Sequence, residues 1–146
     1  MKCASSGSAI RAVILGLAIA ASPAHSETGV QARLSLDLNA VEQIEQACRL
    51  VFVVTNTTGK SIEEMTLETV LFDQGGKVSR FTLFDFKALP QGKPRVRQFD
   101  LPDTHCAAVA RILINGAASC KGEGLTGTEC IDHLDVKSST RTEIAG

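Results

Sequence analysis

Apolar and polar residues alternate along much of the chain after residue 33. Leu34, Leu36 and Leu38 are separated by polar residues, and this period of two is typical of a strand that buries one face. The segment 48–54 is apolar on both faces, which predicts a central strand. The same reasoning predicts seven strands, over residues 34–38, 48–54, 65–72, 77–83, 95–101, 108–114 and 133–137.

Turn-forming residues separate these strands about every ten residues. Residues 56–59, 73–76 and 89–92 combine Gly with Asn, Asp or Pro, and such combinations favour tight turns. Short strands with regular turns predict an all-β fold, a β-sandwich of about seven strands. The chain shows no internal repeat, low-complexity tract or linker, so these strands are expected to form one domain.

Three segments are less regular. Residues 41–47 fit either a helical turn or a loop that leads into the strand at Cys48. Residues 107–114 contain enough alanine for a helix, but their β-branched end and Gly116 favour a strand closed by Asn115 and Gly116. Residues 138–146 are expected to form a frayed tail or to lie along a sheet edge.

Residues 1–26 have the order of a cleavable Sec signal peptide. Lys2 and Arg11 precede an apolar run over residues 12–21, and small residues follow up to Ser26. Ten apolar residues span about 15 Å as a helix, half of a ~30 Å hydrocarbon core, so no permanent membrane anchor is expected after cleavage. We predict a mature chain that begins at Glu27 and works in the periplasm or is secreted.

Cleavage changes the charge and the size of the working protein. The 146 residues become 120, and the 15 Lys+Arg become 13 because Lys2 and Arg11 are lost, against 16 Asp+Glu. Residues 27–146 suffice for one domain with a core. A net charge of −3 gives no reason to expect nucleic acid or an anionic membrane as a partner. Trp and Tyr, which dominate binding hot spots, are absent.

The stretch 48–101 resembles the FxLYD-type, immunoglobulin-like domains of exported bacterial proteins. The resemblance rests on residues 54–56, 70–73 with Gly76, the turn at 89–92 and the strand around Phe99. Phe72 stands where that family usually has tyrosine. The chain is also similar to small periplasmic proteins of proteobacteria that carry no assigned activity. The resemblance implies an immunoglobulin-like sandwich and an adhesive or accessory role, and it brings no catalytic residues.

Four cysteines remain once Cys3 leaves with the signal peptide. An even number in an oxidising compartment predicts two disulfides, and four cysteines allow three pairings. In an immunoglobulin-like sandwich the strand of Cys48 faces the strand that follows Cys106, so Cys48–Cys106 is geometrically reasonable. Cys120 and Cys130 enclose a glycine-rich loop that burial could not hold, and a bridge between them would do so.

The sequence offers little support for a metal site or a thiol nucleophile. His105 and His133 could join Cys106, Cys120 and Cys130 in a zinc set, but nine residues separate the last two cysteines and no CxxC occurs. Adjacent His105 and Cys106 would point to opposite faces of an extended chain, which disfavours a Cys–His pair. We expect disulfides, no metal and no cofactor.

Other catalytic patterns are equally weak. A Ser–His–Asp trio can be assembled on paper from Ser119, His133 and Asp135, but the GxSxG turn of many serine hydrolases is absent. No glycine-rich segment precedes the GK[ST] of a phosphate loop.

The basic stretch at 93–97 is the most distinctive polar feature. Lys93, Arg95 and Arg97 could bind an acidic partner, and the contact surface is predicted to include either this edge or loop 121–129. The alternative is structural: Arg97 has the parity of Phe99, so the arginine stems would cover the core rim while their heads pair with Asp or Glu.

These observations favour a non-enzymatic, exported binding or accessory module whose partner is an unknown protein or envelope component. The alternative is a small periplasmic hydrolase or thiol-dependent enzyme whose site assembles from loops and leaves no local motif.

Overall fold

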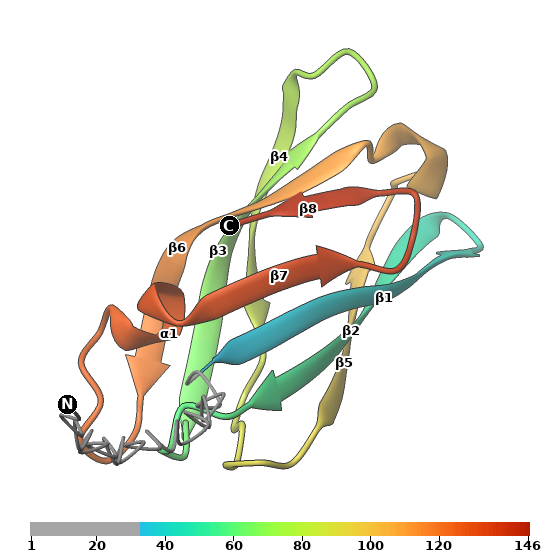
Figure 1. Ribbon diagram of the computed structural model, residues 1–146. Coiled ribbons are helices and arrows are strands. Elements are labelled where there is room, and N and C mark those ends of the chain that lie inside the picture. Colours follow the sequence, from blue (N-terminus) through green and yellow to red (C-terminus); the bar gives the residue numbers. More distant parts are fainter. Residues whose placement is uncertain (1–32) are drawn as a thin grey trace, which may run out of the picture.

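The computed structural model describes residues 33–146, so the predicted signal peptide and the expected start at Glu27 lie outside the described residues. Eight strands form two four-stranded sheets (Figure 1). The first sheet has the order β5-β2-β1-β7 and contains β1 (Leu34–Ile44), β2 (Ala47–Asn56), β5 (Arg95–Leu101) and β7 (Leu134–Ser138). The second has the order β4-β3-β6-β8 and contains β3 (Glu64–Phe72), β4 (Val78–Asp85), β6 (Arg111–Lys121) and β8 (Glu143–Ala145).

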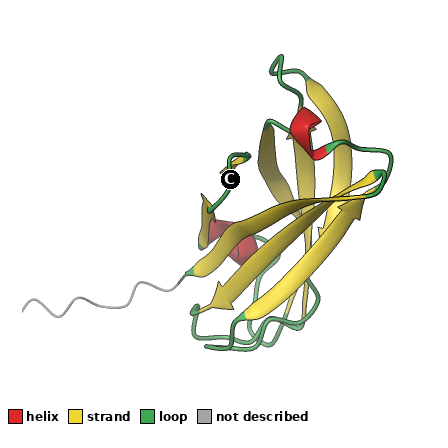
Figure 2. Cartoon of the chain, turned by 90° about the vertical axis from the view of Figure 1, so that its right-hand side faces the viewer, coloured by secondary structure: helices red, strands yellow, loops and turns green. Residues whose placement is uncertain are grey.

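The predicted all-β sandwich is confirmed, with eight strands in place of about seven. The only helical segments of the described chain are η1 (Cys106–Ala108) and α1 (Glu129–Asp132) (Figure 2). Within residues 33–146, therefore, no helix is long and apolar enough to cross a membrane.

The core lies between the two sheets and is filled by alternate residues of each strand. Strand β2 is interior to its sheet, as predicted, and its inward residues are fully buried. These are Cys48, Leu50, Phe52 and Val54. Burial of one large apolar side chain contributes about 1.5–3 kcal/mol. The residues that the period-two pattern places on the inner face therefore supply, through their burial, the main stabilising contribution to the fold.

Four phenylalanines pack together at the side of the sandwich where β4 and β5 form the sheet edges. Phe84 and Phe99 are stacked with ring centroids 4.4 Å apart, and Phe86 meets Phe99 edge-on at 5.0 Å. Phe52 lies within 6.0 Å of all three other rings. The cluster joins residues from both sheets and so fixes how the sheets face each other.

The opposite side is closed by the last two strands. β7 pairs parallel with β1 in one sheet, and β8 pairs parallel with β6 in the other. A short loop carries the chain between them, so β7 and β8 lie side by side (Figure 1). The expected tail at 138–146 thus includes an edge strand.

Two boundaries differ from the predicted ones. β1 continues to Ile44 and turns directly into β2 at residues 45–46, where Glu45 adopts a positive φ of 51°. The segment 41–47 is therefore neither a helical turn nor a loop. β6 begins after η1 and runs past Gly116 to Lys121, because register shifts in its pairing with β3 absorb the irregular residues.

Both disulfides join the cysteines expected from the sequence. The long-loop disulfide, Cys48–Cys106, connects β2 to η1 across 58 residues of sequence. The short-loop disulfide, Cys120–Cys130, connects the end of β6 to α1 across 10 residues. Ring-closure entropy implies about 4 and 3 kcal/mol of stabilisation, respectively.

Candidate functional site

The predicted basic edge has mainly a structural role at Arg97. Its Nε donates to the carbonyl of Phe86 at 2.6 Å and its Nη2 to that of Ala88 at 3.0 Å. The inward parity of Arg97 is as expected, but the expectation that its head pairs with a carboxylate is wrong. Both carbonyls belong to the connection between β4 and β5, where no neighbouring strand is available to donate a hydrogen bond to them. The guanidinium of Arg97 satisfies these carbonyls instead.

Lys93 and Arg95 lie at one end of the molecule, before and at the start of β5. Arg95 Nη1 donates to the carbonyl of Pro94 at 3.0 Å. Lys93 is exposed. The structure therefore gives the three predicted binding residues different surroundings: Arg97 supports the fold, Arg95 is half-buried and Lys93 is exposed.

Loop 121–129 is anchored by Lys60. The Lys60 ammonium donates to the carbonyl of Gly124 at 2.6 Å and to Glu129 Oε1 at 2.9 Å. Glu129 also accepts from the amide of Thr126, and these hydrogen bonds, that of Lys60 first, lower its pKa. Together with the short-loop disulfide, these contacts attach the loop to α1, β6 and the segment before β3.

Two residues of the Ser–His–Asp trio considered from the sequence, Ser119 and Asp135, are bonded to other partners. Ser119 donates to the carboxylate of Glu64, and this hydrogen bond is the main cause of the lowered pKa of Glu64. Asp135 accepts from Arg33 at 3.2 Å. Within residues 33–146, no three His, Cys, Asp or Glu side chains come together as a possible metal site.

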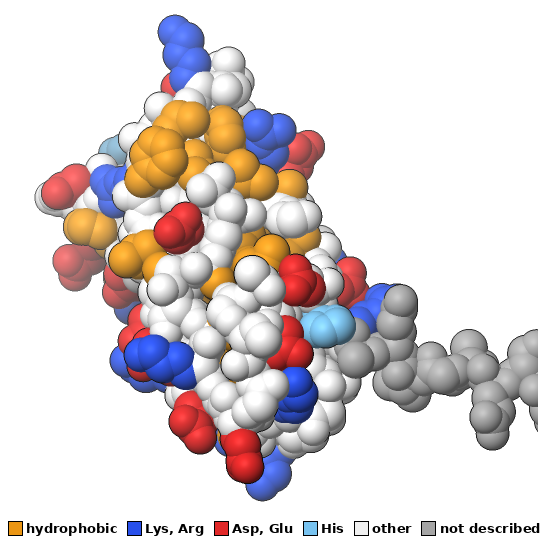
Figure 3. Space-filling model, turned by 90° about the vertical axis from the view of Figure 1, so that its left-hand side faces the viewer, with side chains coloured by type: hydrophobic (Ala, Val, Ile, Leu, Met, Phe, Trp, Pro, Cys, Tyr) orange, Lys and Arg blue, Asp and Glu red, His pale blue; other side chains and the backbone are white. Residues whose placement is uncertain are grey.

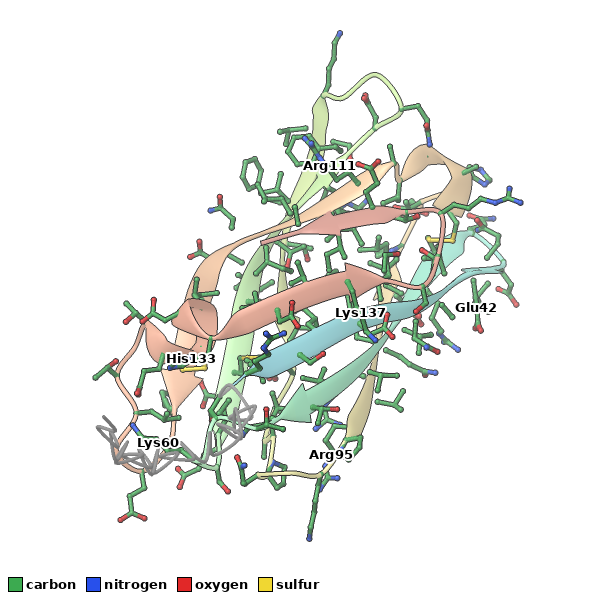
Figure 4. The ribbon with its side chains drawn as sticks, in the orientation of Figure 1. Glu42, Lys60, Arg95, Arg111, His133 and Lys137 are labelled. Carbon is green, nitrogen blue, oxygen red and sulfur yellow. A yellow bond between two sulfur atoms is a disulfide. The ribbon has the colours of Figure 1, made fainter. Side chains whose placement is uncertain are left out.

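A groove that the sequence did not reveal lies at the opposite end from Arg95. Four segments line it: Val41 of β1, residues 72–76 at the end of β3 and in the turn after it, residues 106–111 from η1 to the start of β6, and residues 140–143 from the loop before β8 to its first residue. Its volume is about 780 Å³. We call it the end groove. Figure 4 shows Arg111 near this end of the molecule and Arg95 at the other.

Cross-links between its segments hold the end groove open. The long-loop disulfide ties η1 to β2, and Gln43 Oε1 accepts from the amide of Cys106 at 2.9 Å. Gln74 Nε2 donates to the carbonyl of Ala107 at 2.8 Å, and Thr142 Oγ1 donates to that of Val109 at 3.3 Å. Each wall is thus bonded to η1 or the residues after it, so the groove is preformed.

The groove combines an apolar lining with charges of both signs. Val41, Val109 and alanines of the η1 segment contribute the apolar part, and Arg111, Arg141, Asp73 and Glu143 contribute the charges. Arg111 lies over the ring of Phe72, with Cζ 4.3 Å from the centroid. Neither Arg111 nor Arg141 forms an ion pair with another residue in 33–146. Asp73, in contrast, accepts from the amides of Gly75 and Lys77 and so shapes its own turn.

Sequence reasoning missed this site because its walls are distant in the chain. The available local signals were the turn at 73–76 and the isolated arginines, and neither indicates a groove. Only the pairing of β8 with β6 brings Arg141 and Glu143 to the same end as Arg111.

No protein-family model and no curated protein matches the chain. Among solved structures, the fold is similar to that of IrmA from Escherichia coli, with a TM-score of 0.60 and 14% sequence identity. The similarity covers 73% of this chain and 92% of that chain. At this identity it shows a shared small β-rich fold and nothing about function. The FxLYD-type assignment stays a resemblance of sequence.

Proposed function

We propose that this protein is a non-enzymatic binding module that works outside the cytoplasm and holds a polypeptide segment in the end groove. The observation that carries the proposal is the groove itself, a preformed opening of about 780 Å³. Its η1 wall is tied to β2 by a disulfide, and side-chain hydrogen bonds join that wall to the others. Loops held by a rigid β-sandwich are a common location for binding residues.

The lining favours a polypeptide over a small anion. Arg111 and Arg141 attract carboxylates, while Glu143 at the same rim attracts cations. A peptide offers charges of both signs and apolar side chains for the lining near Val109. Export is supported by the signal-like residues 1–26 and by two disulfides, which persist in oxidising compartments.

Peptides selected from a random library on the folded protein provide the test. We expect the tightest peptides to shift the amide NMR resonances of residues 107–111 and 140–143, and to bind at least about tenfold more weakly to Arg111→Ala/Arg141→Ala. Arg95→Ala is the matched control, because it removes an equivalent guanidinium at the other end. Circular dichroism verifies that each variant is folded.

Two outcomes would contradict the proposal. Peptides that shift residues 93–97 and lose affinity on Arg95→Ala would transfer the function to the basic edge predicted from the sequence. Failure to select any peptide whose binding depends on Arg111 or Arg141 would remove the end groove as the contact site. A hydrolytic or thiol-dependent function has no specific observation in its favour among the described residues.

A further inference from the structure

Three asparagines occur in the chain, and the structure gives them different surroundings. Asn56 is buried and hydrogen-bonded, whereas Asn39 and Asn115 are exposed. Each of the two exposed asparagines lies at a β-bulge. The register skips Asn39 in the pairing of β1 with β2, and it skips Asn115 in the pairing of β6 with β3. A bulged residue of this kind has no direct partner on the neighbouring strand.

The residue that follows each asparagine also differs. Gly116 follows Asn115, while Asn39 and Asn56 are followed by residues that carry a Cβ. Glycine has the least hindered backbone nitrogen and the widest choice of backbone conformations. The backbone nitrogen of residue 116 can therefore approach the side chain before it more easily than the corresponding nitrogen can at the other two asparagines. An exposed bulge and a following glycine thus coincide at Asn115 alone among the residues that the structure describes.

The Asn115 side chain lies on the outer face of the second sheet. It lines a shallow hollow of about 280 Å³ together with Glu68, Phe81 and Leu83. Figure 3 shows this side of the molecule, with apolar side chains gathered in its upper part and acidic side chains among and below them. The only hydrogen bond of the Asn115 side chain within residues 33–146 is a long one, from Nδ2 to Glu68 Oε2 at 3.5 Å. Water therefore reaches the carboxamide.

We propose that Asn115 is a site of spontaneous deamidation. The backbone nitrogen of residue 116 bonds to Cγ of Asn115, the bond from Cγ to Nδ2 breaks, and the proton of the attacking nitrogen leaves with the carboxamide nitrogen as ammonia. The resulting five-membered succinimide adds water and opens at either carbonyl, which gives aspartate or isoaspartate at position 115. Water is the only co-reactant, and no atom is oxidised or reduced. The site lies outside the end groove, so this proposal is independent of the proposed function.

Deamidation adds a carboxylate next to the one that Glu68 already carries. The hydrogen bond between the two side chains is then replaced by repulsion between like charges on neighbouring strands. Asn115→Asp, which imitates the direct product, should therefore raise the unfolding equilibrium constant by up to about fivefold in urea. In a chain that also carries Glu68→Gln, most of this effect should disappear. An equal effect in both backgrounds would contradict this consequence of the modification.

Incubation of the folded protein at mildly alkaline pH tests the proposal, because the attacking nitrogen must lose its proton. Trypsin places each asparagine on a peptide of its own, so mass spectrometry follows the replacement of each amide by a carboxyl group separately. Isoaspartyl methyltransferase labels the isoaspartate product. We expect conversion at Asn115 to be at least about tenfold faster than at Asn39 or Asn56. No conversion at Asn115, or conversion at Asn39 that is equally fast, would overturn the proposal.

Two reciprocal variants test the role of the following residue. Gly116→Ala should suppress conversion at Asn115. The fold tolerates this change, because residue 116 has no positive φ and the added Cβ would meet the end of the Glu68 side chain at 3.4 Å. Ala40→Gly places a glycine after the bulged Asn39 and should accelerate conversion there, and circular dichroism verifies that both variants are folded. Undiminished conversion at Asn115 in Gly116→Ala, or no gain at Asn39 in Ala40→Gly, would show that the proposed combination of bulge and glycine is wrong.

Discussion

Asn56 at the end of β2 offers the sharpest test of how the turn after this strand is held. Its side chain is 1% exposed and makes four hydrogen bonds. Nδ2 donates to the carbonyls of Lys60 and Leu89, both at 2.8 Å. Oδ1 accepts from the amide of Thr58 at 3.0 Å and from its hydroxyl at 2.8 Å. Asn56 thus joins its own turn to the β4–β5 connection.

Two substitutions separate the hydrogen bonds from the shape of the side chain. Asn56→Ala removes all four bonds, and at about 0.5–1.5 kcal/mol each the expected loss of unfolding free energy is about 2–4 kcal/mol. Asn56→Asp keeps the shape and the acceptor, but it replaces the donor by a carboxylate oxygen that faces two carbonyl oxygens. Because an uncompensated buried charge costs several kcal/mol, we expect Asn56→Asp to be at least as destabilising as Asn56→Ala at pH 7.

The two variants should differ in their pH dependence. Burial beside two carbonyl oxygens raises the pKa of the new carboxyl above its ordinary value of about 3.9. The protonated carboxyl can donate a hydrogen bond to one of the two carbonyls, which stabilises the folded protein. This contribution is fully present below the pKa that the carboxyl has in the unfolded chain, and it is lost as pH rises through its higher pKa in the folded protein. The stability deficit of Asn56→Asp relative to Asn56→Ala should therefore shrink from pH 7 to pH 4, by about 1.4 kcal/mol for each unit of pKa elevation.

Urea unfolding followed by far-UV circular dichroism measures these differences, since the chain lacks Trp and Tyr for fluorescence. If the difference in unfolding free energy between Asn56→Asp and Asn56→Ala is the same at pH 4 and pH 7, the reasoning is refuted. A loss below about 1 kcal/mol for Asn56→Ala would also refute it.

Three further predictions concern other stabilising contacts. Replacing both cysteines of the long-loop disulfide by alanine should lower the unfolding free energy by about 4 kcal/mol, and replacing both cysteines of the short-loop disulfide should lower it by about 3 kcal/mol. Equal urea midpoints for the wild type and the two variants would contradict this prediction. Arg97→Met keeps the apolar stem but removes the bonds to the carbonyls of Phe86 and Ala88, so thermal unfolding should show a loss of about 2–3 kcal/mol, whereas Arg95→Ala should stay within about 0.5. The hydrogen bond from Arg49 lowers the pKa of Asp100, so this carboxylate stabilises the fold above its unfolded pKa and the effect is lost as pH falls through its folded pKa. In Asp100→Asn, the unfolding free energy should accordingly fall less steeply than in the wild type as the pH is lowered below the ordinary pKa of aspartate. An unchanged dependence on pH in this acidic range would show that the ion pair contributes nothing.

Local pattern was sufficient for the features that depend on near neighbours in the chain. Apolar residues on both faces of segment 48–54, including Val51 and Val53 on the outer face, predicted a strand interior to its sheet, where neighbouring strands cover part of that face. The turn at 89–92 was predictable from Pro and Gly, and Gly92 has the positive φ of 70° that favours glycine. The inward parity of Phe99 followed from the same alternation.

Tertiary structure alone decided the features that join distant segments. The β1–β2 turn carries no glycine at Glu45, and strand pairing imposes its positive φ against local preference. Arg97 could be placed on the inner face from its parity, but its carbonyl partners come from residues 9 and 11 positions earlier, whose free backbone groups no sequence pattern reveals. The end groove exists because β8 returns to pair with β6. Alternation determines which side of a strand is buried, whereas the choice of neighbouring strand depends on packing between residues far apart in the chain.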